Sequence, residues 1–163
     1  MSIFRDKLWV SNDDIEFFTD SAASIGMGIF VNGKWAQGKW GSNFPTEVKS
    51  NNITFLELFP ILVALEIFGD VVKNKKVLFH CDNAAVCEMI NSQTSKCERV
   101  MDLVRPMVLR CLHLNAFIKA QHIPGVKNII ADALSRFQMG IFHENAPRAD
   151  PFPTMIPRHL LLL

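Results

Sequence analysis

The chain has 163 residues, of which 49% are hydrophobic and 20% are charged, and its formal net charge is +1. This length and composition fit one domain with a full core, so no second domain is needed. The longest apolar runs fall far short of the roughly 20 residues that cross a bilayer. Residues 1–12 carry charges but lack the apolar segment of a signal peptide. We therefore expect an intracellular protein, in the cytoplasm or the nucleus, that does not enter a membrane.

The composition also bears on metals and on nucleic acid. Cys81, Cys87, Cys97 and Cys111 form no Cys-x-x-Cys pair, and their spacing fits neither a zinc site nor a disulfide framework. We expect reduced, mostly buried thiols. A net charge of +1 provides no strong basic field, so the chain would not hold nucleic acid tightly unaided.

The first strand signal is residues 15–22, Ile-Glu-Phe-Phe-Thr-Asp-Ser-Ala, in which residues of good strand propensity lead into Asp20. A carboxylate at the end of a strand built for burial must be paired or must bind a metal. The alternative is that Asp20 is a turn residue. Residues 25–31 and 34–40 read as two further strands joined by Asn32-Gly33, the strongest short hairpin signal. Together the three segments predict an antiparallel meander.

The middle of the chain presents two more acids at element ends. A loop over 41–52 leads to Thr54-Phe-Leu-Glu57, which opens an apolar helix to about residue 68. Thr-x-x-Glu is also a capping-box pattern, so Glu57 has an alternative role at the helix start. Residues 76–81 form an apolar strand that ends on Asp82-Asn83. Either residue could cap the helix over 84–91, which leaves the other one free.

The last predicted elements are a helix over 97–111, a strand over 115–121, and a short helix over 129–136. A Pro-Gly loop that begins at His122 separates the last two, and Asn128 is the expected cap of the short helix. Asp132 lies on that helix four residues before Arg136, so its alternative role is a solvated ion pair.

Three parts of the chain are expected: a lead-in over residues 1–14, one domain over 15–137, and a connector over 138–163. The connector is predicted as a linker, or as an extended wrap over the surface, because closely spaced prolines exclude helix and central strand. These are Pro147, Pro151, Pro153 and Pro157.

The element order predicts an α/β domain with a mixed sheet, in which the antiparallel meander is followed by two parallel-type crossovers. In such a sheet the first and fourth strands are neighbours, so at least three of Asp20, Glu57, Asp82 and Asp132 would meet. Like charges in one cleft repel one another unless cations hold them. A carboxylate cage without thiolates favours Mg²⁺ or Mn²⁺, and two such ions about 4 Å apart can hydrolyse a phosphodiester.

Four sequence blocks carry a resemblance to a known family. They are Thr-Asp20-Ser, Leu-Glu57-Leu, Cys-Asp82-Asn83 and His122-Ile-Pro-Gly-Val-Lys-Asn-Ile-Ile-Ala-Asp132-Ala-Leu-Ser-Arg136. In order and spacing they resemble the ribonuclease H domain of retroelement reverse transcriptases, over residues 15–137. The forms Glu57-Leu-Phe-Pro-Ile and Asp82-Asn-Ala-Ala-Val resemble DIRS and Ngaro elements more than gypsy-like ones. The resemblance implies a ribonuclease H-like fold with a five-stranded sheet, three strands antiparallel and two parallel, flanked by helices.

The resemblance also implies residue roles. Asp20, Glu57, Asp82 and Asp132 would bind two Mg²⁺ ions, with Mn²⁺ as a substitute, and His122 would assist proton transfer or product release. Ser21, Thr54 and Asn83 are the expected substrate contacts. Ser21 and Thr54 depart from the family pattern, because the family often has Gly or Ala directly after the first aspartate and Asn three residues before the glutamate.

The expected activity is cleavage of the RNA strand of RNA–DNA hybrids during reverse transcription. The partners would be the hybrid and the adjacent reverse transcriptase domains of one polyprotein. The basic protrusion of some cellular family members has no counterpart between residues 91 and 99. Affinity for the hybrid would therefore rely on the adjacent domains. Two alternatives stay open. One is a catalytically inactive or domesticated module that binds nucleic acid or protein, against which the four acids argue. The other is a nuclease of the same fold that acts on DNA, against which the His122 loop argues.

Overall fold

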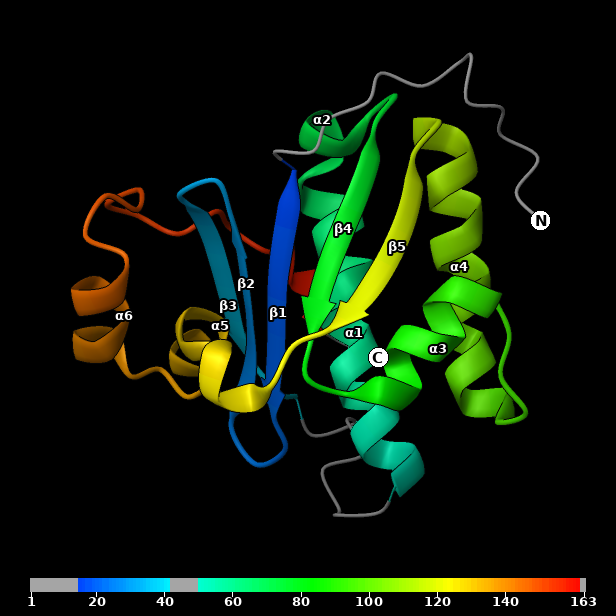
Figure 1. Ribbon diagram of the computed structural model, residues 1–163, viewed down its shortest axis with the longest axis horizontal. Helices are drawn as coiled ribbons and strands as arrows, with labels where there is room; N and C mark the ends of the chain where they lie inside the picture. Colours follow the sequence, from blue (N-terminus) through cyan, green and yellow to red (C-terminus); the bar gives the residue numbers. More distant parts are fainter. Residues whose placement is uncertain (1–14, 42–49, 162–163) are drawn as a thin grey trace.

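The computed structural model describes residues 15–41 and 50–161 (Figure 1). The expected lead-in over residues 1–14 and most of the loop over 41–52 lie outside the described residues. Among the described residues, no helix combines the length and the apolar character that crossing a membrane requires.

A five-stranded mixed sheet forms the centre of the domain, in the order β3-β2-β1-β4-β5. Its strands are β1 (Glu16–Ala22), β2 (Gly26–Val31), β3 (Lys34–Lys39), β4 (Lys76–Cys81) and β5 (Phe117–His122). β1, β2 and β3 are antiparallel, whereas β4 is parallel to both β1 and β5. Asn32 and Gly33 have φ angles of 48° and 81°, the backbone that a tight hairpin turn requires. The predicted sheet is confirmed.

Helices cover the two faces of the sheet. The longer ones are α1 (Ser50–Ile67), α3 (Ala84–Ser92) and α4 (Glu98–Leu114), and the shorter ones are α2 (Gly69–Val72), α5 (Ile129–Ser135) and α6 (Met139–Asn145). The 3₁₀ turns are η2 (Gly125–Lys127) and η3 (Arg158–Leu161). α1 and α4 pack against each other on one face, while α5 packs on the opposite face across β1, β2 and β3 (Figure 1).

The core has two parts that correspond to these faces. In the larger part, beneath α1 and α4, Phe17 and Phe79 are fully buried and stack with ring centroids 4.8 Å apart. The smaller part lies under α5 and α6, where Trp35 packs 4.9 Å from the fully buried Phe142. Burying an aromatic side chain of this size stabilises the fold by about 1.5–3 kcal/mol.

The segment after Phe137 differs from the predicted connector. Met139 and Phe142 lie on one face of α6 and, with Ala146 directly after the helix, pack against Trp35 of β3. The prolines begin only at Pro147, so they never opposed a helix over the preceding residues. Among these prolines the chain lies along β3, at the edge of the sheet. There the backbone N–H groups of Asp150 and Thr154 donate to carbonyl oxygens of Gly33 and Trp35 at 2.8 and 2.7 Å.

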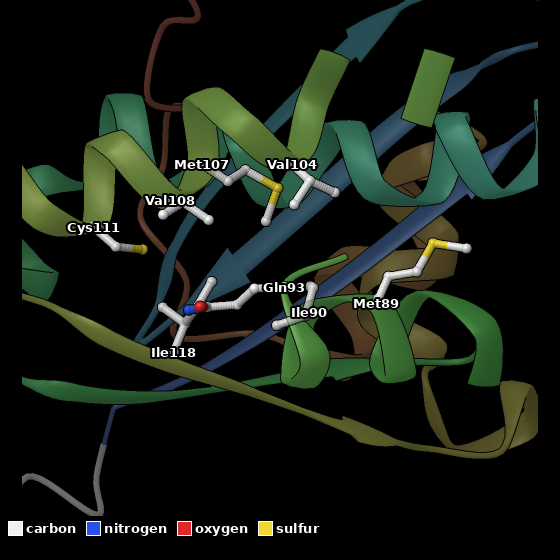
Figure 2. Close-up of a pocket in the computed structure, with 8 residues that line it drawn as sticks. All are labelled: Met89, Ile90, Gln93, Val104, Met107, Val108, Cys111 and Ile118. Carbon is white, nitrogen blue, oxygen red and sulfur yellow. The ribbon is translucent and has the colours of Figure 1, made fainter. Parts of the chain in front are cut away.

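Figure 2 shows a small hollow between α3, α4 and β5. It is lined by Met89, Ile90, Gln93, Val104, Met107, Val108, Cys111 and Ile118. Its walls are apolar apart from one amide and one thiol, and they contain none of the predicted site residues. The hollow is therefore a gap in helix packing rather than the candidate site.

Candidate functional site

The sheet topology brings Asp20 and Asp82 together. β1 and β4 pair in parallel register up to Phe18 and His80, and no pair between these strands follows. Asp20 and Asp82 each come two residues after that last pair, so both lie where the two strands separate. Residues on both faces of the sheet can approach side chains at such a split. α1 supplies Glu57 from one face, and α5 supplies Asp132 from the other.

Asp20 is nearly enclosed, with 4% of its surface exposed. The hydroxyl of Ser135 lies 2.8 Å from Oδ2 of Asp20, and Asp132 lies within hydrogen-bond distance of the same carboxyl group. Burial and, after it, the charges of Asp82 and Asp132 together raise the pKa of Asp20 to about 7, while the Ser135 hydrogen bond acts in the opposite direction. The folded protein thus holds an acid that ionises only at neutral pH in the absence of a cation.

Glu57 approaches from α1 and is 6% exposed. Burial raises its pKa well above the usual range, and the charges of Asp20 and Asp82 add to this effect. The backbone N–H of Ser21 donates to the carboxylate and acts in the opposite direction. Because α1 begins at Ser50, Glu57 lies beyond the first turn and cannot complete a capping box with Thr54. The capping alternative for Glu57 is therefore wrong.

Asp82 is the free member of its pair. Oδ1 of Asn83 accepts a hydrogen bond of 3.1 Å from the backbone N–H of Val86, so Asn83 caps α3. Burial raises the pKa of Asp82, the charge of Asp132 raises it further, and nearby His122 lowers it. His122 itself ends β5 and is exposed.

Asp132 is far more open than Asp20 and Glu57, with 42% of its side chain exposed. The predicted alternative partner is present, because Nε of Arg136 donates to Oδ1 of Asp132 at 3.0 Å. An ion pair this exposed contributes little to stability. Asp132 also influences the ionisation of Asp20, Glu57 and Asp82. Asp132 therefore forms the ion pair with Arg136 and also belongs to the acidic cluster.

Two residues missed at the sequence level fix α5 against β1. Asn128 was expected to cap α5, but its side chain makes no capping bond and instead donates from Nδ2 to the carbonyl oxygen of Thr19 at 2.9 Å. Ser135, fully buried, reaches both Asp20 and the carbonyl oxygen of Asp132 at 2.8 Å. Ser135 lies three residues after Asp132, on the same helix face, and that spacing was the available signal.

Gly28 of β2 explains how α5 comes so close. A Cβ atom at Gly28 would lie 2.5 Å from Cβ of Leu134 and 2.7 Å from the carbonyl oxygen of Ala131, both on α5. The helix therefore rests on bare strand backbone directly opposite Asp20, which pairs with Gly28 across the sheet. This contact places Asp132 over the first strand.

The three residues expected to contact the substrate also have structural roles or are buried within the protein. The hydroxyl of Ser21 donates to the carbonyl oxygen of Leu56 at 2.6 Å, which ties β1 to α1. Asn83 uses its side-chain oxygen as the α3 cap. Thr54 is buried, with 7% of its surface exposed. The substrate contacts of these three residues therefore stay predictions.

The cluster has the chemistry of a site for a hard divalent cation. Four carboxylates from β1, α1, the end of β4 and α5 lie close together, their charges raise the pKa of Asp20, Glu57 and Asp82 beyond the effect of burial, and two of the four are almost fully buried. Among the described residues, the ion pair of Arg136 with Asp132 is the one salt bridge made by these four acids. Oxygen donors with unbalanced negative charge are what Mg²⁺ and Mn²⁺ bind. The residues present therefore fit such ions.

Comparison with known proteins agrees with the fold. No family model matches the chain, and no curated protein matches its sequence. Solved structures do match: LC11-RNase H1 in complex with an RNA/DNA hybrid is 17% identical with a TM-score of 0.56, over 73% of this chain and 91% of that one. RNase H1 from the archaeon Halobacterium salinarum NRC-1 is 14% identical with a TM-score of 0.52, over 73% and 90%. The N-terminal RNase H domain of rv2228c from Mycobacterium tuberculosis is 15% identical with a TM-score of 0.51, over 81% and 99%. The chain has a ribonuclease H-like fold.

Proposed function

We propose that the chain is a metal-dependent endonuclease that hydrolyses the RNA strand of RNA–DNA hybrids. One observation carries this proposal: Asp20, Glu57, Asp82 and Asp132 converge from four elements, and burial followed by the charges of their neighbours raises the pKa of the first three. Such an arrangement is costly for folding, and a pair of bound cations would relieve it. The likeness to RNase H1 structures supports the same assignment at the level of the fold.

The two buried acids and the two more exposed acids would bind the metal from different sides. Asp20 and Glu57 would anchor it from below, since Ser135 fixes the orientation of Asp20 and the Ser21 backbone N–H fixes that of Glu57. Asp82 and Asp132 are more exposed and would hold it from the side that faces solvent. Two bound Mg²⁺ ions, or Mn²⁺ in their place, supply the activation of water and the stabilisation of the leaving oxygen.

His122 would handle the proton. Its side chain is exposed, two residues after Ala120, the last buried residue of β5. Its charge lowers the pKa of Asp82. Histidine exchanges protons near neutral pH, so a mobile imidazole beside the acids can take up or deliver a proton as the product leaves. It does so without contributing to the metal cage.

Hybrid selectivity would come from shape and 2′-hydroxyl contacts rather than from base sequence. The solved neighbour that holds an RNA/DNA hybrid supports this choice of substrate. The four sequence blocks further favour a retroelement reverse transcriptase of the DIRS or Ngaro kind as the setting. Adjacent reverse transcriptase domains would then supply affinity that a net charge of +1 does not.

A cleavage assay on three labelled duplexes tests the proposal. The purified chain, given saturating Mg²⁺, should cut the RNA strand of an RNA–DNA hybrid and leave duplex RNA and duplex DNA intact. Preferential cutting of duplex DNA would instead establish the DNA-directed alternative. Binding of the hybrid without cutting, in both Mg²⁺ and Mn²⁺, would establish the inactive module.

A further inference from the structure

A thiol lies against the acidic cluster and has no part in the proposed reaction. Cys81 is the last residue of β4, it is fully buried, and its Sγ lies 4.0 Å from Oε2 of Glu57. One ligand atom each from Glu57, Cys81 and Asp82 lie within 4.8 Å of one another. One sulfur and two carboxylate oxygens thus face a common point.

This donor set suits a different class of ion from the four carboxylates alone. Thiolate sulfur is a soft ligand that favours Zn²⁺ and Cd²⁺, whereas Mg²⁺ takes oxygen ligands in an octahedral arrangement. A tetrahedral zinc ion with a sulfur at about 2.3 Å and an oxygen at about 2.0 Å holds these two atoms about 3.5 Å apart. The separation of 4.0 Å between Cys81 and Glu57 is slightly longer, so a small side-chain rotation would close it.

We propose that Glu57, Cys81 and Asp82 form a binding site for one thiophilic divalent cation of the Zn²⁺ or Cd²⁺ class. Binding forms a metal–sulfur bond and releases the thiol proton of Cys81 to solvent, with no electron transfer and no oxidant. The ion engages two of the four carboxylates, so it competes with Mg²⁺ for the cluster. The binding site stands on the geometry, while the inhibition of hybrid cleavage rests on the function proposed above.

The other thiols provide internal comparisons. Sγ of Cys87, in the first turn of α3, lies 3.9 Å from the carbonyl oxygen of Cys81, and Cys87 is 7% exposed. Cys111 is equally buried, but it lines the hollow beside α4, among apolar side chains and away from the acids (Figure 2). Cys81 is the thiol that contacts a carboxylate of the cluster, which makes Cys111 a matched control for burial without acid contact.

Titration with Cd²⁺ tests the site directly, because cadmium–thiolate bonds absorb in the ultraviolet. The reduced chain should bind Cd²⁺ with a charge-transfer band. Cys81→Ser should abolish the band and weaken binding at least tenfold, and Cys111→Ser should leave both unchanged. A wild-type chain without a band, or a band that persists in Cys81→Ser and disappears in Cys87→Ser or Cys111→Ser, would overturn the proposal.

A second variant guards against misfolding of Cys81→Ser. Glu57→Gln keeps the thiol and removes one carboxylate, so Cd²⁺ affinity should fall at least tenfold while circular dichroism stays that of the wild type. Unchanged affinity in this variant would also overturn the proposal. In hybrid cleavage, Cd²⁺ should inhibit the wild type more strongly than Cys81→Ser. If the chain cleaves no hybrid at all, the absorption experiment still decides on the site.

Discussion

Replacing Asp20 with asparagine should stabilise the metal-free protein at alkaline pH. Burial, followed by the charge of Asp82, raises the pKa of Asp20 from 3.8 to about 7. The folded state therefore holds this proton more tightly than the unfolded state does. Stability falls as the pH rises from the unfolded pKa to the folded one and is constant above it. Asparagine cannot ionise, so Asp20→Asn avoids the loss.

The size of the effect follows from the two pKa values. The difference between 3.8 and about 7 corresponds to an upper bound of about 4 kcal/mol. Because Glu57 and Asp82 share the same repulsion and the site can relax, we expect a gain on the order of 2 kcal/mol at pH 8. In a chain of this length that is a rise in melting temperature of about 4–8 °C. At pH 5 folded Asp20 is protonated, so the gain should be smaller.

The assay is thermal unfolding of wild type and Asp20→Asn at pH 5 and pH 8, with a chelator present. Added Mg²⁺ should then raise the melting temperature of the wild type more than that of the variant, since a ligand that binds only the folded state stabilises it by mass action. Asp70→Asn, at an exposed acid on α2, is the control and should follow the wild type. A variant that is no more stable than wild type at pH 8, or equal Mg²⁺ shifts in both proteins, would refute the reasoning.

Three further substitutions separate the proton carrier, the positioning residue and the helix contact. His122→Ala should lower kcat by about 10²-fold and leave the Mg²⁺-induced thermal shift near wild type; normal turnover with a lost metal response would remove His122 from the mechanism. Ser135→Ala, which deletes the hydrogen bond to Asp20, should weaken Mg²⁺ binding by roughly 10–100-fold in calorimetry, and an unchanged affinity would contradict this role. Gly28→Ala should cost about 1–3 kcal/mol in urea unfolding, because its Cβ would strike Leu134; wild-type stability would show that α5 does not need bare backbone there.

The sequence predicts the sheet well because its signals are local. The Asn32-Gly33 turn and the alternation around it determine the meander, and the apolar run before Asp82 determines the fourth strand. The acids could be found for a related reason, since a carboxylate at the end of a buried strand needs a physical explanation. The sequence predicted that at least three of the four acids would meet, and the structure brings all four together, although their metal-binding role stays a prediction.

The contacts that complete the site are not local, and this is why they were missed. Asn128 sits where a helix cap is expected, and only the docking of α5 on β1 shows that its amide reaches Thr19 instead. Ser135 points at Asp20 because Gly28 admits the helix so closely. The proximity of Cys81 to Glu57 likewise depends on the packing of α1 against β1, the neighbour of β4 in the sheet.

The helix α6, after Phe137, was not predicted for a different reason. Its prolines dominated the composition and suggested a connector, although Met139, Phe142 and Ala146 already had helical spacing. Phe142 is fully buried against Trp35, so the helix exists because the sheet offers it an apolar partner. Composition averaged over a tail conceals a short amphipathic element within it.

Turnover of a labelled RNA–DNA hybrid by Asp82→Asn, under saturating Mg²⁺ and beside the wild type, tests the central claim most directly. Asp82 is the free, half-buried acid at the split between β1 and β4, and the variant keeps its size while removing one charge from the cluster. Cleavage should vanish while the melting temperature of the metal-free protein is kept or raised. Retention of about a tenth or more of wild-type turnover by a folded variant would contradict the metal-centred account, because losing a metal-ligand charge should cost several kcal/mol of transition-state stabilisation.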